Sequence, residues 1–131
     1  MGLFQVDALV TGPTGAREHL SLLVDTGATF LVIPQTVADR LHLHPTDMCS
    51  LQLAGGRRDV WPLAEVRLHL GEREVTTPCL IAPEGQPLLG AVALESLRLA
   101  VDPVAKRLVP VDAFIGRARP GAASSSVEEA F

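Results

Sequence analysis

One carboxylate of this 131-residue chain stands where a purely structural residue would be unexpected. Asp25 follows the apolar run Leu22-Leu23-Val24, which is typical of a core strand, and leads into the polar loop Thr26-Gly27-Ala28-Thr29. A carboxylate placed near a core needs hydrogen bonds that compensate for lost water. Gly27 permits close backbone approach, and the Thr26 hydroxyl and nearby amide groups can act as partners. The pattern indicates either a positioned acid–base group or an Asx-type turn between strands.

A second short motif lies further along the chain. Leu88-Leu89-Gly90 is a short apolar run that ends in glycine, and residues 91–97 have the pattern of a brief helix. Together with Leu23-Val24-Asp25-Thr26-Gly27-Ala28, this arrangement resembles the retropepsin-like aspartic proteases. The resemblance implies that Asp25 is the catalytic residue and that Thr26, Gly27 and Ala28 support it. It also implies that Leu88, Leu89 and Gly90 pack beside the catalytic loop.

A glycine-containing hairpin lies between the two motifs, where this family carries its flap. The resemblance makes residues 50–62 the substrate-binding flap, with Ala54, Gly55, Gly56 and Arg57 around its tip. Trp61 is either a residue that lines the cleft or an ordinary core aromatic, and the sequence leaves both interpretations open. Arg57 and its neighbour Arg58 are more typical of solvated charges at a hairpin tip than of specificity determinants.

These motifs need elements to position them, and the hydrophobic pattern predicts mainly strands. The predicted strands are residues 4–8, 19–24, 30–33, 50–54, 60–62, 64–70, 74–82, 88–90, 99–101 and 108–111, and the predicted helices are 35–43 and 91–97. The resemblance covers residues 4–111 and implies an all-β, closed, barrel-like fold with a flap hairpin and one or two short helices. The terminal hairpin is more similar to the bacterial and eukaryotic damage-inducible members than to the viral ones, which predicts a bacterial-type single-domain member.

The length and composition predict one domain. A chain of 131 residues with 47% hydrophobic and 20% charged residues can bury one core but is too short for two ordinary lobes. We expect the protease-like domain to occupy residues 1–115. Residues 116–131 are rich in Arg, Pro, Gly, Ala and Ser, and this composition predicts a disordered tail.

Other classes of site have little support in the sequence. The net charge is −4 and the basic residues are scattered, which argues against a nucleic-acid partner. No apolar run has the length of a membrane span, and the first residues do not resemble a secretory signal, so we expect a cytoplasmic protein that does not bind membranes. Cys49 and Cys79 are predicted to be free, buried thiols. The histidines form no metal-binding pattern, and we expect neither a metal nor another cofactor.

The chemistry of aspartic proteases requires a second carboxylate. One carboxylate draws a proton from water while the other hydrogen-bonds the peptide carbonyl, and the two share one proton. Because this chain has one Asp-Thr-Gly sequence, we expect a twofold homodimer that brings two copies of Asp25 together. The predicted function is therefore that of an aspartic endopeptidase acting on extended polypeptides. The resemblance further implies that the Thr26 hydroxyls reach across the dimer axis.

Two other functions compete with this prediction. The fold could serve only as a catalytically silent module for peptide binding or dimerisation, because a sequence does not show that two loops meet productively. Residues 25–29 also resemble the Asp-x-Gly-x-Thr phosphate-binding turn of the actin and sugar-kinase group. The length of the chain argues against that turn, because the kinase fold needs a second lobe with further motifs.

Overall fold

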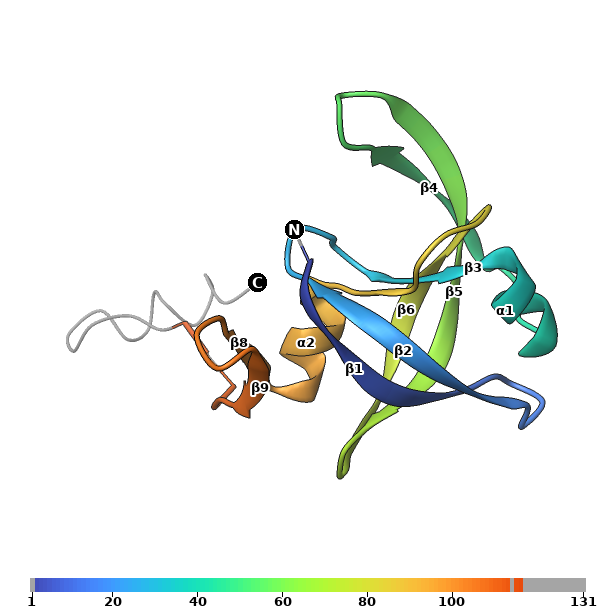
Figure 1. Cartoon of the computed structure of the whole chain (residues 1–131). Helices are drawn as coiled ribbons and strands as arrows, with labels where there is room; N and C mark the ends of the chain where they lie inside the picture. Colours follow the sequence, from blue (N-terminus) through green and yellow to red (C-terminus); the bar gives the residue numbers. More distant parts are fainter. Residues whose placement is uncertain (1, 114, 117–131) are drawn as a thin grey trace, which may run out of the picture.

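The protein folds into a set of antiparallel and parallel strands with two short helices (Figure 1). The structure is a computed structural model, and it describes residues 2–113, 115 and 116. The strands are β1 (Gly2–Thr11), β2 (Arg17–Asp25), β3 (Leu31–Pro34), β4 (Asp47–Gln52), β5 (Arg58–Leu70), β6 (Arg73–Ala82), β7 (Leu88–Leu89), β8 (Leu99–Asp102) and β9 (Arg107–Pro110), and the helices are α1 (Gln35–Arg40) and α2 (Ala91–Leu97).

The main sheet closes on itself. Its strands are ordered β1-β2-β7-β3-β6-β5-β4, and β1 also pairs with β5, with Val10 opposite Leu68. β4 lies outside this ring and pairs only with the first half of β5, from Gln52 opposite Arg58 to Asp47 opposite Leu63. The predicted all-β architecture, with a closed ring of strands and two short helices, is therefore confirmed.

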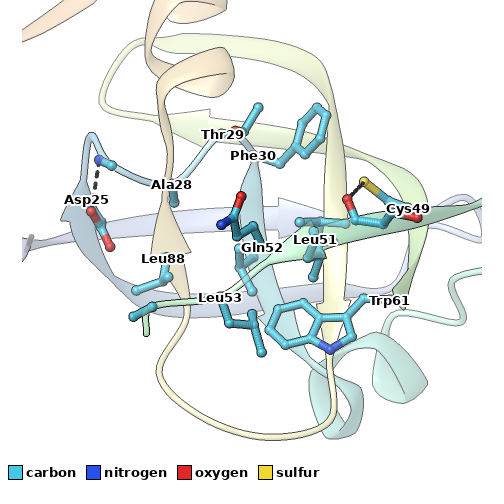
Figure 2. Close-up of a pocket in the computed structure, with 15 residues that line it drawn as sticks. Asp25, Ala28, Thr29, Phe30, Cys49, Leu51, Gln52, Leu53, Trp61 and Leu88 are labelled. Carbon is cyan, nitrogen blue, oxygen red and sulfur yellow. Dashed lines mark hydrogen bonds between the residues drawn. The ribbon is translucent and has the colours of Figure 1, made fainter. Parts of the chain in front are cut away.

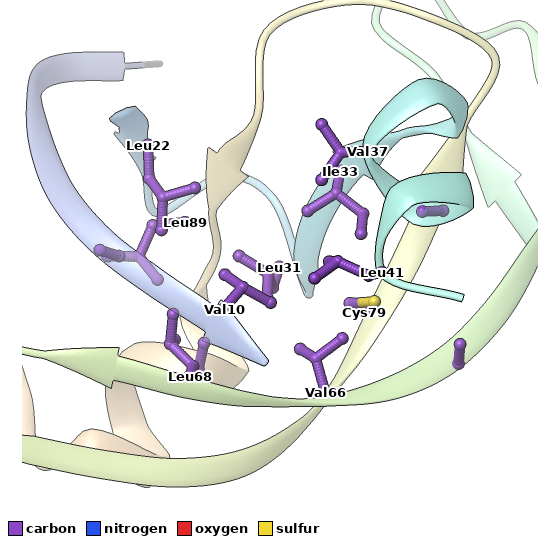
Figure 3. Packing of buried hydrophobic residues seen from close by; sticks show 14 of the residues in the cluster. Val10, Leu22, Leu31, Ile33, Val37, Leu41, Val66, Leu68, Cys79 and Leu89 are labelled. Atoms are coloured by element: carbon purple, nitrogen blue, oxygen red, sulfur yellow. The ribbon is translucent and has the colours of Figure 1, made fainter. Parts of the chain in front are cut away.

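The core lies inside the ring, where side chains from strands distant in the sequence meet (Figure 3). The alternation predicted for residues 64–70 is present, since Ala64, Val66 and Leu68 are buried while Glu65 and Arg67 are exposed. Full burial of a Val, Leu or Ile side chain stabilises the folded state by about 1.5–3 kcal/mol. The fully buried large residues include Val10, Leu22, Leu31, Ile33, Leu41, Leu68, Leu89 and Leu97.

The strands of the predicted flap have other boundaries in the structure. Residues 60–62 and 64–70 form one strand, β5, rather than two. Pro62 pairs with β4, and the ladder with β6 begins only at the next residue, Leu63. The β6 side of β5 therefore needs no N–H from Pro62, which is why a proline is tolerated within this strand. β4 also begins at Asp47 and ends at Gln52, earlier than predicted, because residues 53–57 form the hairpin turn.

Helix α1 is shorter than the predicted segment 35–43. It ends at Arg40, and His42 has a φ of 56°, a left-handed conformation that cannot continue a helix. The Leu43 N–H donates to the Ala38 carbonyl at 3.0 Å, which closes the end of the helix. The helix therefore ends three residues before residue 43, its predicted end.

Helix α2 and the last hairpin complete the described chain. α2 spans Ala91–Leu97 as predicted, and Arg73 of β6 donates to the carbonyls of Leu97 and Arg98 at 2.7 and 2.9 Å. β8 and β9 form a separate two-stranded sheet that lies beyond α2, outside the ring (Figure 1). The predicted tail, residues 116–131, lies outside the described residues except for residue 116.

The two cysteines differ in their surroundings. Both are free, but only Cys79 is buried, whereas Cys49 is half-buried on β4. Burial raises the pKa of the Cys79 thiol to about 12. The prediction of two buried thiols was therefore wrong for Cys49, because β4 is an edge strand outside the ring. Of the two helices that the structure describes, neither is long and apolar enough to cross a membrane.

Candidate active site

The candidate catalytic residue is the last residue of strand β2. The Gly27 N–H donates to Asp25 Oδ1 at 3.0 Å (Figure 2), and the Ala28 N–H donates to the Asp25 carbonyl at 3.1 Å. The loop is thus an Asx-type turn, and that turn also holds the carboxylate. Asp25 is only partly buried in the single chain, and Thr26 and Gly27 are exposed. The expectation of a buried setting was wrong, because β2 ends here and the loop leaves the core.

Strand β7 and the start of α2 hold this loop from behind. Leu88 and Leu89 pair in parallel with Leu23 and Val24 of β2. The N–H groups of Ala91 and Val92 then donate to the carbonyls of Ala28 and Thr29, both at 2.8 Å. These bonds join the two short sequence motifs through their backbones. The loop is fixed at both ends, by β2 and by α2.

Gly90 lies at the point of closest approach between β7 and the loop. A Cβ atom at this position would lie 2.3 Å from the Phe30 carbonyl oxygen and 2.7 Å from that of Ala28. Gly90 has an extended backbone, with φ −94° and ψ −177°, so its conformation alone would allow any residue. It is the lack of a side chain that lets the two segments meet.

The predicted flap is the hairpin of β4 and β5. Cys49 pairs with Trp61 near the middle of the hairpin. At its tip, the Leu53 N–H donates to the Arg57 carbonyl at 2.6 Å, and the Gly56 N–H donates to the Leu53 carbonyl at 3.0 Å. Gly55 and Gly56 have φ values of 88° and 86°, which L residues rarely adopt. A Cβ added at either glycine would meet nothing within 4 Å, so the tip is open.

A cleft of about 770 Å³ separates the Asp25 loop from the flap. Among the described residues that line it, Asp25 is the only one with a charged side chain. Figure 2 shows Asp25 toward one end of the cleft and Trp61 with Cys49 toward the other. The lining residues are Asp25, Gly27, Ala28, Thr29, Phe30, Val32, Cys49, Ser50, Leu51, Gln52, Leu53, Ala54, Trp61, Leu80 and Leu88.

Only some of the predicted site residues line the cleft. Asp25, Gly27, Ala28, Leu88, Ala54 and Trp61 line the cleft, whereas Thr26, Leu89, Gly90, Gly55, Gly56 and Arg57 do not. Leu89 points into the core of the ring and is fully buried. Trp61 is half-buried and packs against a small apolar cluster outside the main core, so it is a cleft residue and not a residue of that core.

Four residues that line the cleft, Ser50, Leu51, Gln52 and Leu53, belong to the predicted flap, residues 50–62, although none was predicted singly. Five further lining residues were not predicted as site residues: Thr29, Phe30, Val32, Cys49 and Leu80. The alternation of side chains along a strand gave an indication for Val32. Leu31 and Ile33 face the core, so Val32 between them must face the other side of the sheet. Leu80 lies in the same way between two core residues, Cys79 and Ile81. The register of β6 with β3 then places it opposite Val32 in the cleft.

The pKa of the Asp25 carboxyl is lowered from the ordinary value of 3.8, chiefly through a hydrogen bond with the amino-terminal group. Partial burial raises the pKa, while the backbone N–H groups of Gly27 and Ala28 lower it. The loop thus supplies amide donors to a carboxylate at the mouth of an apolar cleft. In the described part of the chain, no three His, Cys, Asp or Glu side chains gather to hold a metal ion.

Comparison with known proteins adds to this geometry. Residues 6–93 match the model of a family described as aspartyl protease. The fold is similar to that of EIAV protease complexed with the inhibitor HBY-793, with a TM-score of 0.56 and 20% identity, over 80% of this chain and 90% of that chain. It is also similar to the simian foamy virus (mac) protease, with a TM-score of 0.50 and 17% identity, over 69% of this chain and 90% of that chain. No curated protein matched the sequence.

Proposed function

Because this chain belongs to the aspartyl protease family and has a retropepsin-like fold, we propose that it is an aspartic endopeptidase that hydrolyses extended polypeptides. One observation carries the proposal. Among the described residues that line the cleft, Asp25 has the only charged side chain, and loop amides hold its carboxylate. A single carboxylate of this kind suits activation of a water molecule.

The proposed reaction needs two carboxylates in one site. One accepts a proton from water as the water oxygen attacks the peptide carbonyl carbon, and the protonated partner donates to the carbonyl oxygen. Collapse of the tetrahedral intermediate then breaks the C–N bond, and a proton passes to the leaving amine. Since one cleft contains one such carboxylate, we propose that a second copy of the chain supplies the other across a twofold axis.

The exposure of the loop supports this arrangement. Thr26 and Gly27 are exposed and Asp25 is only partly buried, although backbone hydrogen bonds from α2 hold the same loop at Ala28 and Thr29. A second loop placed against this surface would cover the carboxylate and bring its partner close. We propose that the Thr26 hydroxyl reaches the opposite loop, which would keep the two loops in register.

The flap supports an extended substrate. Among the strands that the structure describes, β4 pairs only with β5, along one edge, so its other edge can pair with a peptide strand over the cleft. Strand-like pairing recognises the peptide backbone and leaves its side chains to enter pockets on alternate sides. The class of substrate that follows is an unfolded or extended polypeptide segment.

The decisive experiment replaces Asp25 with Asn. We expect Asp25→Asn to keep the fold and the dimer but to abolish cleavage of an unstructured peptide library at every pH tested. Asp7→Asn makes the same chemical change at an exposed carboxylate on β1 outside the cleft, and it should cleave like the original protein. Sedimentation equilibrium of all three proteins should show a dimer that dissociates on dilution.

Two results would contradict the proposal. Cleavage by purified Asp25→Asn protein would exclude Asp25 as the catalytic group. Cleavage by a strictly monomeric protein would exclude the shared site. Peptide binding without any cleavage by the unmodified dimer would instead favour a silent binding module.

A further inference from the structure

One edge of strand β5 has a gap in its pairing. β6 covers the opposite edge from Leu63 onward, so β4 and β1 share this one. β4 covers it as far as Leu63, which lies opposite Asp47, and β1 covers it from Arg67, which lies opposite Thr11. Glu65 lies midway, and among the strands that the structure describes none pairs with it on this edge. We call the space beside Glu65 the ladder gap.

The backbone groups of Glu65 point into the ladder gap. The Leu63 carbonyl accepts the Thr46 N–H at 2.8 Å, so the backbone of Leu63 faces this edge. In an antiparallel sheet every second residue directs its N–H and C=O to the same edge, and Glu65 therefore does so too. On the other edge Glu65 lies opposite Pro78, which has no N–H to donate. The gap thus offers one N–H and one C=O of a strand that lack a partner strand.

A cavity of about 370 Å³ lies at the ladder gap. It is separate from the cleft, because no described residue lines both. Its walls come from parts of the chain that are distant in the sequence: the turn after β1, the segment before β4, and strands β5 and β6. The residues that line it include Thr11, Gly12, His44, Thr46, Glu65 and Arg67.

The walls of this cavity are held by contacts within the protein. The Gly12 N–H donates to the Ala16 carbonyl at 2.8 Å, and a Cβ atom added at Gly12 would collide with the carbonyl oxygen of Leu41 after α1. On the opposite side, Arg67 donates to Glu74 Oε2 at 3.1 Å and to the Thr76 hydroxyl at 3.0 Å. The cavity therefore needs little rearrangement before it can accept a ligand, which lowers the entropic cost of binding.

Glu65 provides the charge of the cavity that is not neutralised. The guanidinium of Arg67 forms an ion pair with Glu74, whereas the exposed Glu65 carboxylate forms none with any described residue. A residue that paired with the backbone of Glu65 would place its side chain on the same face of the sheet, beside this carboxylate. A Lys or Arg side chain would gain a partner of opposite charge there, and an Asp or Glu side chain would be repelled.

We propose that the ladder gap is a second polypeptide-binding site, which takes one basic residue of an extended segment. The backbone of that residue pairs with Glu65 between β4 and β1, and its Lys or Arg side chain lies beside the Glu65 carboxylate. The site lies outside the cleft and does not depend on the proposed protease function.

Amide NMR of the Asp25→Asn protein tests this site directly, because the Glu65 N–H is part of the proposed contact. We would titrate capped Ala/Ser peptides that carry a single Lys, Arg, norleucine or Glu. The Lys and Arg peptides should shift the Glu65 amide signal. They should bind about threefold more tightly than the norleucine peptide and about tenfold more tightly than the Glu peptide. Absence of binding, equal affinity across the series, or shifts confined to the Asp25 loop and the flap would overturn the proposal.

A change in the peptide backbone tests the strand-like pairing. An ester in place of the amide of the Lys residue removes the N–H that donates to the Glu65 carbonyl, and binding should weaken about fivefold. The same ester at the next residue, whose N–H points away from β5, should leave the affinity unchanged. Equal effects of the two esters would exclude the pairing.

Variants at Glu65 test the role of its charge by the same titrations. Glu65→Gln keeps the backbone groups and should bind the Lys and norleucine peptides equally. Glu65→Lys should reverse the order, so that the Glu peptide binds most tightly. Glu72→Gln makes the same chemical change in the turn between β5 and β6, outside the cavity, and should leave the order unaltered. Urea unfolding shows that each variant is folded, and a folded Glu65→Gln protein that still prefers Lys would exclude Glu65 as the charge partner.

The outcomes separate this site from the protease proposal. A Lys-dependent shift of the Glu65 amide, with no cleavage of any peptide by the unmodified protein, would support the ladder gap and contradict the protease. Cleavage that depends on Asp25, with no peptide shifting the Glu65 amide, would leave the protease intact and overturn the ladder gap.

Discussion

The Asp25 loop and the tip of the flap border the same cleft. A glycine is needed in both regions, at Gly90 packed against the loop and at Gly56 in the flap tip, but for different reasons. At Gly90 the backbone is extended and ordinary, but carbonyl oxygens of the loop occupy the space where a side chain would be. At Gly56 the surrounding space is empty, but φ is 86°. One glycine is required by packing between distant segments, and the other by the local geometry of a turn.

This difference matches the tasks of the two regions. The loop is tied by backbone hydrogen bonds to β2 and α2, as a catalytic group that must keep its position requires. The flap is held by its ladder and its turn, and a Cβ atom added at Gly55 or Gly56 of its tip would meet nothing within 4 Å. With the Asp25 loop held rigidly on one wall of the cleft and a hairpin that can move on the other, a peptide could enter without disturbing Asp25.

The strongest test of this comparison is Gly90→Ala. A methyl group placed 2.3 Å from a backbone oxygen must displace the loop or α2, and such overpacking should lower the free energy of unfolding by about 3 kcal/mol. Because the Asp25 loop moves with it, cleavage should also be lost. Urea unfolding and peptide cleavage measure the two effects. An unaltered midpoint and normal activity would mean that this contact is not a constraint.

The matched change on the flap is Gly56→Ala, which should have a smaller effect. The new side chain meets nothing within 4 Å, so the cost arises only from the positive φ and should be about 1 kcal/mol. The same urea unfolding experiment applies, with both variants studied side by side. If Gly56→Ala destabilised the protein as much as Gly90→Ala, the contrast between packing and turn geometry would fail.

The smallest expected effect concerns the charge on the loop. In the single chain the pKa of Asp25 is below 3.8, whereas in the proposed pair one carboxyl keeps its proton into mildly acidic pH. At a pH between the pKa of Asp25 in the single chain and that of the shared carboxyl in the dimer, association takes up a proton. The dimer should therefore become more stable as the pH falls from about 7 to about 5. Each unit by which the pKa of the shared carboxyl exceeds the working pH should give about a tenfold tighter dimer.

Sedimentation equilibrium across this pH range measures the effect. Asp25→Asn should remove the pH dependence, because no shared proton remains. Asp47→Asn, at an exposed carboxylate near the base of the flap, should keep it. A dimer that weakened steadily on acidification in the unmodified protein would argue against a shared proton.

Much of the fold followed from local patterns. The alternation of residues 64–70 was predicted, although these residues form only the second part of strand β5, and the brief helix was predicted with its observed boundaries, 91–97. Both predictions succeeded because strand and helix periods are visible in neighbouring residues. The end of α1 was not predicted, because the residue with the left-handed conformation is His42 and not a glycine, the residue that usually marks the end of a helix. The prediction wrongly divided β5 into two strands after Pro62, because only the pairing of strands shows which N–H groups are needed.

The sequence by itself determined the candidate catalytic carboxylate, the turn residues around it and the apolar segments that form strands, because each is a property of adjacent residues. Only the tertiary structure decided that Gly90 must lack a side chain and that Leu80 belongs to the cleft. It also decided that Trp61 faces a pocket and not the main core. The physical reason is that strand register brings residues distant in the sequence together, and no local pattern encodes which of them meet.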